Sequence, residues 1–216
     1  MAIDGPAGAG KSTIARRVAD RLGFVYIDSG AMYRAVALWA LRENLDLSDA
    51  GRLEELARAA RIEFAPGGHS VQLNGADVTE AIRSPEVSEG ASKVSTFAGV
   101  RKALVEKQRQ IGATHNVVME GRDIGTVVFP HADVKIFLDA DPATRAGRRA
   151  REIGQKGETV RTEEVAEQIR ERDERDRTRA AAPLAQAPDA LYVDTTHLTL
   201  DQVEAVILEL IRGSLH

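Results

Sequence analysis

Gly5-Pro6-Ala7-Gly8-Ala9-Gly10-Lys11-Ser12 is the stretch on which the interpretation of this 216-residue chain depends. Its spacing fits G-x-x-x-x-G-K-[ST], the pattern of a P-loop, in which backbone N–H groups surround a phosphate group. The glycines allow tight curvature because they carry no Cβ. Lys11 supplies a cation to the β- and γ-phosphates, and the Ser12 hydroxyl is a natural Mg²⁺ ligand. The stretch therefore predicts a phosphate site.

The residues on either side supply the structural context that this loop requires. Ala2–Asp4 is typical of the end of a strand. After the loop, apolar residues recur every four positions at Ile14, Val18 and Leu22, which predicts a helix. The N-terminus of such a helix favours anions. A glycine-rich turn that binds nothing is the alternative, and the order of strand, loop and helix argues against it.

The composition bounds the class of protein. Hydrophobic residues make up 43% and charged residues 29%, as expected for a globular α/β domain. The net charge of -4 gives no reason to expect a nucleic-acid partner. The absence of cysteine excludes disulfides, thiolate zinc sites and a cysteine nucleophile. We find neither a membrane-spanning apolar run nor a signal segment, and therefore expect a cytoplasmic protein with no membrane partner.

Polar residues follow two further predicted strands at the point where each strand ends. The strand at 24–27 runs into Asp28-Ser29-Gly30, and Arg34 lies in the first turn of the next predicted helix. The strand at 117–119 runs into Glu120-Gly121-Arg122-Asp123-Ile124-Gly125. In open α/β sheets, ligands bind at the carboxyl ends of the strands. A polar turn and a surface arginine are the alternatives, but two carboxylates and an arginine within four residues favour a site.

Residues 51–111 differ in pattern from the sequence on either side. Short alternating segments at 62–65 and 71–73, together with the tight-turn signal Asn74-Gly75, predict a small antiparallel hairpin or meander. Ser84 is expected to cap a following helix. We expect this stretch to form an inserted lobe outside the main sheet.

Residues 145–181 are rich in arginine and predict two helices joined by a flexible turn. Asp141-Pro142 suits the start of the first helix, and the turn spans Gly154–Gly157 with Lys156. Thr162 is expected to cap the second helix. We interpret this segment as a hinged lid over phosphates, with a charged solvated hairpin as an equal alternative.

One stripe of the second helix changes from apolar to charged along its length. Its members are separated by four, three, four and three residues, so they share one face. They are Val165, Ile169, Arg172, Asp176 and Arg179. Because unpaired buried charges are costly, we interpret the three charged residues as facing a ligand in a wet pocket. A solvent-exposed ion pair is the alternative.

The whole sequence predicts an α/β fold of the P-loop NTPase class, with a doubly wound parallel sheet of about five strands. Within a single domain over residues 1–216, we expect a core, an inserted lobe and a helical lid. The core would comprise about 1–50, 112–144 and 182–216, the lobe about 51–111, and the lid with its flanking helices about 145–181. Two phosphate-binding regions on one sheet indicate phosphoryl transfer between two bound molecules, which depends on positioning and charge neutralisation.

In four stretches the chain resembles the bacterial cytidylate kinases, the CMP/dCMP kinases of the nucleoside monophosphate kinase group. These stretches are residues 3–12, 28–34, 120–130 and 172–179. Many NTPases share the P-loop, whereas the other three stretches in this order are specific. The resemblance covers essentially the whole chain. It implies Mg²⁺-dependent transfer of the γ-phosphate of ATP to CMP or dCMP, a lobe that binds the monophosphate, and a monomer that acts in pyrimidine nucleotide metabolism.

The resemblance also implies roles for individual residues. ATP would be held by Gly5, Pro6, Ala7, Gly8, Ala9, Gly10, Lys11, Ser12 and Thr13, with Ser12 as the metal ligand. The CMP phosphate would be fixed by Ser29, Arg34, Arg122 and Arg179, the ribose by Arg172 and Asp176, and cytosine by Ser92, Arg101 and Asp123. The catalytic set would be Lys11, Arg122 and Arg179. Glu120 occupies a position near the expected Mg²⁺ water shell.

The base-reading residues also make chemical sense by themselves. Cytosine presents an amino donor at N4, which a carboxylate such as Asp123 accepts, whereas uracil presents an acceptor there. Arg101 can donate to the acceptor edge of the ring. Two further hypotheses stay open from the sequence: another small-molecule kinase on the same scaffold, and a nucleotide-dependent switch that signals through a partner.

Overall fold

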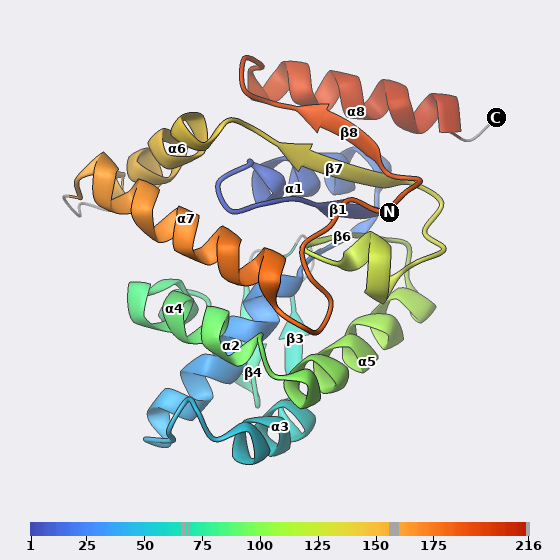
Figure 1. Cartoon of the computed structure of the whole chain (residues 1–216). Helices are drawn as coiled ribbons and strands as arrows, with labels where there is room; N and C mark the ends of the chain where they lie inside the picture. Colours follow the sequence, from blue (N-terminus) through green and yellow to red (C-terminus); the bar gives the residue numbers. More distant parts are fainter. Residues whose placement is uncertain (66–67, 69, 156–159, 215–216) are drawn as a thin grey trace.

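The structure is a computed structural model that describes residues 1–214, apart from 66–67, 69 and 156–159 (Figure 1). Its main sheet is parallel and has five strands in the order β2-β6-β1-β7-β8, which confirms the predicted sheet. The strands are β1 (Ala2–Asp4), β2 (Val25–Asp28), β6 (Val117–Gly121), β7 (Lys135–Asp139) and β8 (Leu191–Asp194). Strand β1 is central and pairs with β6 and β7, so the P-loop that follows it opens at the middle of the carboxyl edge.

Helices cover both faces of this sheet. The helices are α1 (Lys11–Leu22), α2 (Ser29–Arg42), α3 (Ala50–Ala59), α4 (Pro85–Val94), α5 (Ala98–Thr114), α6 (Pro142–Gly154), α7 (Thr162–Thr178) and α8 (Leu200–Ser214). Ile3 belongs to an apolar cluster with α1 and α8, and Ala2 belongs to one with α5 and the π-helical segment η3 (Ile124–Val128). Consecutive residues of a strand point to opposite faces, which explains this division.

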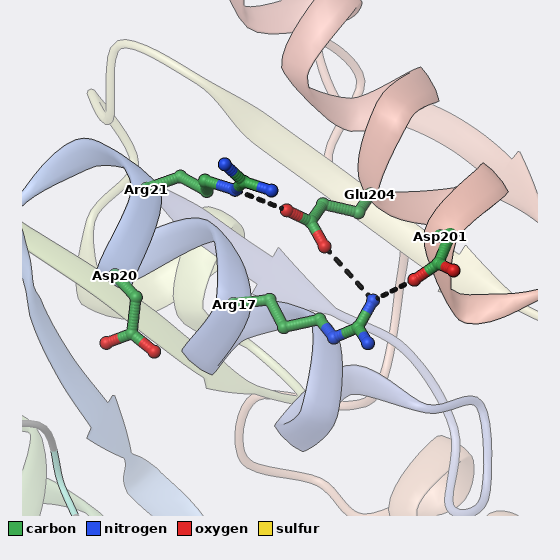
Figure 2. A pocket seen from close by; sticks show the side chains of 5 residues that line it. All are labelled: Arg17, Asp20, Arg21, Asp201 and Glu204. Carbon is green, nitrogen blue, oxygen red and sulfur yellow. Dashed lines mark hydrogen bonds and ion pairs between the residues drawn. The ribbon is translucent and has the colours of Figure 1, made fainter.

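Ion pairs join α1 to α8 at the protein surface, on the side of the sheet that these two helices cover. Figure 2 shows Arg17 and Arg21 of α1 directed toward Asp201 and Glu204 of α8. Arg17 Nη1 lies 2.6 Å from Asp201 Oδ1 and 3.1 Å from Glu204 Oε2, and Arg21 Nε lies 3.0 Å from Glu204 Oε1. These pairs lie on the surface where the two helices meet and involve none of the predicted site residues.

The inserted lobe contains the predicted antiparallel strands. They are β3 (Ile62–Phe64), β4 (Val71–Leu73) and β5 (Ala76–Asp77), and they form a separate three-stranded sheet. A short 3-10 turn, η2 (Ala81–Arg83), precedes α4. Buried residues of α2, α3, α4 and α5 form one apolar cluster with β4. Helix α2 therefore packs into the lobe although its first residue lies at the edge of the main sheet.

Capping side chains fix where several helices begin. The predicted cap Ser84 accepts the Val87 N–H at 3.2 Å, and Asp141 accepts the Thr144 N–H at 3.0 Å. The prediction that Thr162 caps α7 is wrong, because Thr162 is the first helical residue and Arg161 precedes it without a side-chain cap. Arg161 is instead paired with Glu164 in the first turn of the helix.

Helices α6 and α7, which contain the residues of the predicted lid, pack against each other and stand beside the loop that precedes α1 (Figure 1). Ala146, Val165 and Ile169 form their apolar contact. The predicted turn at Gly154–Gly157, with Lys156, lies mostly outside the described residues. Nowhere in the described chain does a helix combine the length and the apolar character that a membrane span needs.

Candidate active site

The P-loop forms an anion cradle at the start of α1. Gly10 occupies the N-cap position with φ 91°, a conformation that favours glycine, and no side chain caps the helix there. By contrast, α2, α4 and α6 are capped by Asp28, Ser84 and Asp141. The first N–H groups of α1 therefore point into the loop without an intrahelical acceptor, which is the arrangement that binds a phosphate.

Lys11 is buried inside the loop that it follows. Its Nζ donates to the Pro6 carbonyl at 2.7 Å. The pKa of Lys11 is lowered from 10.5 to about 7, mainly by burial; the nearby cations Arg122 and Arg172 also lower it, whereas Glu120 and Asp4 raise it. A bound polyanion would favour the charged lysine, so this site is electrostatically prepared for phosphate.

Glu120 ends β6 beside the Ser12 hydroxyl. Tyr26 Oη donates to Glu120 Oε1 at 2.6 Å, and Ser12 is also hydrogen-bonded to this carboxylate. Burial raises the pKa of Glu120, and the neighbouring Asp28 carboxylate raises it further. Hydroxyl and carboxylate oxygens are the donors that Mg²⁺ prefers. The described residues contain no group of three or more acidic, histidine or cysteine side chains for a metal, so Mg²⁺ would depend on phosphate oxygens and water as well.

Four cationic side chains from different elements approach the same space. Arg34 Nη2 donates to Asp28 Oδ2 at 2.6 Å, and Arg122 Nε donates to Asp176 Oδ2 at 2.8 Å. Burial lowers the pKa of Arg172 to about 10, and repulsion from Arg122 and Arg34 contributes. Because Arg122 and Arg172 also depress the pKa of Lys11, these cations lie close enough to act on one ligand.

Two of these arginines keep hydrogen-bond capacity, and their charges act on the carboxylate beside them. The Nε atoms of Arg34 and Arg172 are buried and have no hydrogen-bond partner among the described residues. Burial by itself would raise the pKa of Asp176, but the cations around it bring that pKa below its ordinary value. Ser29, at the start of α2, completes the group, and its Oγ donates to the Glu120 carbonyl at 2.6 Å.

The residues expected to read the base form a buried polar cluster. Arg101 of α5 pairs with Asp123, and both are about 5% exposed. Arg179 Nη2 lies 3.7 Å from Asp123 Oδ1, and its Nη1 lies 3.5 Å from Asp176 Oδ1. Asp123 therefore lies between two guanidinium groups. It also follows Arg122, one of the four cations described above, in the sequence.

Ser92 approaches this cluster from α4. Its Oγ is buried without a hydrogen-bond partner in the described chain. The Ser92 carbonyl accepts Ser95 Oγ at 2.9 Å, and the Ser95 carbonyl accepts Arg101 Nη1 at 3.3 Å. One short hydrogen-bond chain thus links two of the three predicted base contacts, and the third, Asp123, is paired with Arg101.

Four further residues belong to this region. Sequence reasoning gave no site role to Tyr33 or Asp4, and it placed Arg145 and Asp173 only within the predicted lid segment. Tyr33 lies under Arg101, with 5.4 Å between the Arg101 Cζ and the ring centroid, and burial raises its pKa to about 12. Asp4, just before the P-loop, accepts the N–H groups of Ile124 and Gly125 at 2.8 and 2.7 Å. Asp173 and Arg145 form a buried ion pair against the P-loop. Only the proximity of Tyr33, Asp4 and Asp173 to Arg34, Gly5 and Arg172 in sequence could have signalled them.

The fold and the composition of the site are those of a P-loop kinase, with the P-loop after β1 and a cluster of cationic side chains beside it. A family model described as cytidylate kinase matches residues 1–213. The chain belongs to the cytidylate kinase family.

Individual relatives agree with this assignment over nearly the full chain. The cytidylate kinase of Solibacter usitatus is 61% identical over 215 residues, which cover 99% of this chain and 92% of the relative. That of Carboxydothermus hydrogenoformans is 53% identical, with 98% and 96% covered. A solved structure of an uncharacterized protein from Eubacterium ventriosum shares the fold, with a TM-score of 0.51, 11% identity, and 98% and 97% coverage.

Proposed function

We propose that this protein transfers the γ-phosphoryl group of ATP to CMP or dCMP, giving ADP and CDP or dCDP. The observation that carries the proposal is the buried Arg101–Asp123 pair, which directly adjoins the cations that face Lys11. A phosphate and a cytosine ring of one molecule would be bound by these two neighbouring groups. Membership of the cytidylate kinase family supports the same activity.

ATP is assigned to residues 5–13. The backbone N–H groups at the start of α1 would bind the phosphates, and Lys11 would neutralise charge at the β- and γ-positions. Magnesium, when bound to these phosphates with Ser12 as its protein ligand, would neutralise charge that develops during transfer. We assign the nucleoside part of ATP to a pocket of about 390 Å³ between α6 and residues 196–199, because Arg148, which lines this pocket, lies 4.0 Å from the position that a Cβ at Gly10 would occupy.

The acceptor phosphate is assigned to Ser29, Arg34, Arg122 and Arg179, and the ribose to Arg172 and Asp176. In the free protein, Arg34 and Arg122 are paired with Asp28 and Asp176. A bound phosphate would take over part of this pairing and supply the missing acceptors for the buried guanidinium groups. Catalysis then follows from positioning and charge neutralisation by Lys11, Arg122 and Arg179, with no covalent intermediate on the protein.

Selection of cytosine is assigned to Asp123 and Arg101, with Ser92 beside them. The carboxylate accepts from the N4 amino group of cytosine, whereas O4 of uracil would present a lone pair to a buried anion. A buried polar mismatch leaves groups unsatisfied at about 1–3 kcal/mol each. Sites built in this way reject the analogue that lacks the matching group.

The proposed organisation is a single domain with three parts: the core, the lobe at about 51–111 and the lid at about 145–181. Helix α2 would connect the core to the lobe, since its buried residues belong to the lobe's apolar cluster. The proposal also includes a monomer that acts in the cytoplasm, which the sequence led us to expect.

An assay of acceptor-dependent ADP release tests the proposed function. ATP and Mg²⁺ are supplied with CMP, dCMP, UMP, AMP or shikimate in turn. We expect strong turnover with the two cytidine nucleotides alone. Comparable turnover with UMP would be consistent with kinase activity, but it would contradict the assignment of cytosine selection to Asp123. Folded protein that binds ATP but shows no acceptor-dependent ADP release would contradict the kinase activity itself.

A further inference from the structure

The P-loop is held by a buried ion pair that has no assigned role in either substrate site. Asp173 of α7 and Arg145 of α6 are each 4% exposed and are paired with each other. Asp173 Oδ1 accepts the Ala7 N–H at 3.3 Å, and Arg145 Nη1 donates to the Ala7 carbonyl at 3.0 Å. Both polar groups of one P-loop residue are therefore bound by one ion pair, which closes a ring of hydrogen bonds.

Other contacts hold Arg145 rigidly in this position. Its Nε donates to the Ala140 carbonyl at 3.0 Å and lies 3.8 Å from Asp139 Oδ1, at the end of β7. The Arg145 backbone also packs against the loop, since a Cβ added at Gly8 would lie 2.8 Å from the Arg145 carbonyl oxygen. The end of β7, the P-loop and both lid helices thus meet at this guanidinium group.

The loop needs such support because its own backbone is permissive. Gly8 and Gly10 have φ angles of 75° and 91°. Glycine adopts this conformation at little energetic cost, but it adopts other conformations as easily. Ala7 contributes to two successive peptide groups of the loop. The first is bound at its Pro6 carbonyl by Lys11 and at its Ala7 N–H by Asp173, and the second is bound at its Ala7 carbonyl by Arg145. The ion pair therefore helps to hold both peptide groups in one orientation before any phosphate arrives.

The same turn of α7 faces the proposed acceptor site. Asp173 lies between Arg172 and Asp176, which are assigned to the ribose, and Asp176 binds Arg122. We propose that Asp173 and Arg145 are positioning residues, which fix the P-loop relative to α7 and so align the phosphates of the donor with the acceptor. This inference rests on the proposed function. Misplacement by about 1 Å can reduce a rate by about 100-fold.

Steady-state kinetics and direct ATP binding test the inference in the wild-type protein and in two variants. Asp173→Asn keeps the size of the side chain and removes its charge, and Arg145→Lys keeps the charge and removes the planar fork. For both, we expect the KM and Kd for ATP·Mg²⁺ to rise at least tenfold and kcat to fall. The Kd for CMP in the absence of ATP should stay within about twofold of the wild-type value.

Glu204→Gln is the matched control, because Glu204 is a mostly buried carboxylate that binds two arginines between α1 and α8, away from the site (Figure 2). It should lower the thermal midpoint and leave both ATP constants within twofold of wild type. If Asp173→Asn and Arg145→Lys behave like this control, the pair is only structural and the inference is overturned. If Asp173→Asn does not fold, Arg145→Lys alone decides by the same criterion.

The proposed function and this inference fail in different ways. A wild-type protein that binds ATP·Mg²⁺ but does not phosphorylate CMP would overturn the proposed function, while the ATP affinities of the variants would still decide the role of the ion pair. A wild-type protein that does not bind ATP·Mg²⁺ would overturn both.

Discussion

Asp123 is the residue to which we assign most of the selectivity for cytosine, and it lies between Arg101 and Arg179. Replacing Asp123 with alanine should remove the acceptor for the N4 amino group. We expect the ratio of kcat/KM for CMP over UMP to fall at least tenfold, since a buried polar mismatch is then no longer imposed on uracil. An unchanged ratio would contradict the assignment.

The variant also leaves the buried Arg101 guanidinium without its carboxylate, while Arg179 keeps Asp176 as a partner. Breaking such a pair costs about 3–5 kcal/mol of stability. Kinetics should therefore be measured well below the melting range, and Arg101→Ala/Asp123→Ala, which removes the Arg101–Asp123 pair entirely, serves as the control for destabilisation. Both variants should lose discrimination, and the double variant should be the more stable of the two.

Lys11 should couple ATP binding to proton uptake. Its pKa in the free protein is about 7, so the lysine is mostly neutral at pH 8. Bound phosphates favour the charged form and raise the pKa. Calorimetry of ATP·Mg²⁺ binding at pH 8, in buffers of different ionisation enthalpy, should show uptake approaching one proton. At pH 6, where Lys11 is already charged, the uptake should be much smaller. Equal heats in the two buffers at pH 8 would contradict the lowered pKa.

Helix α6 and the P-loop are in close backbone contact. Gly8→Ala would place a Cβ 2.8 Å from the Arg145 carbonyl oxygen at a position with φ 75°. We expect a loss of about 1–3 kcal/mol in the free energy of unfolding, combined with weaker ATP binding, because α6 must move away from the loop. Denaturant unfolding and the KM for ATP measure the two effects.

Gly23→Ala provides the comparison for this prediction. Gly23 has φ 65° at the end of α1, and an added Cβ would meet nothing within 4 Å. It should cost about 1–2 kcal/mol of backbone strain and leave the KM for ATP unchanged. If Gly8→Ala shows the same pattern, contact between α6 and the loop has no effect on the ATP site.

At the scale of helices and strands, the sequence predicted the elements themselves better than where they begin and how they meet. Periodicity identified α1, the antiparallel lobe and the charged stripe of α7, because each signal repeats within one segment. Thr162 was wrongly expected to cap α7, because a Ser or Thr before acidic residues is a cue from the local sequence alone. In the structure Thr162 is already helical, and the cap position falls one residue earlier, at Arg161. The roles of Asp173 and Tyr33 depend on which segments meet in three dimensions, and no local pattern contains that information.

The whole molecule should show a pH dependence of stability that originates at Asp4. Burial raises the pKa of Asp4 from 3.8 to about 6, and the N–H groups of Gly125 and Ile124 reduce this shift. The folded state therefore favours the protonated form. Its contribution to stability is complete below pH 3.8 and is lost as pH rises through about 6.

Asp4→Asn isolates this contribution. The difference in unfolding free energy, wild type minus variant, should fall by up to about 3 kcal/mol between pH 4 and 6.5 and then stay level. Asp46→Asn should give the opposite slope, because the Ser48 N–H lowers the pKa of Asp46 and its contribution is lost as pH falls. A difference for Asp4→Asn that is flat or rises with pH would contradict the raised pKa.

The strand order has a consequence for synthesis of the chain. Strand β1 forms the centre of the sheet, yet its partners β6 and β7 begin only at Val117 and Lys135. While the chain is being translated, the phosphate-binding loop is made first, but the strands that flank it come more than a hundred residues later. Contacts of such long sequence separation form late because a large loop must close. A nascent chain that ends before β7 will have no ATP site. Its apolar first strand will be exposed to chaperones until β7 emerges from the ribosome.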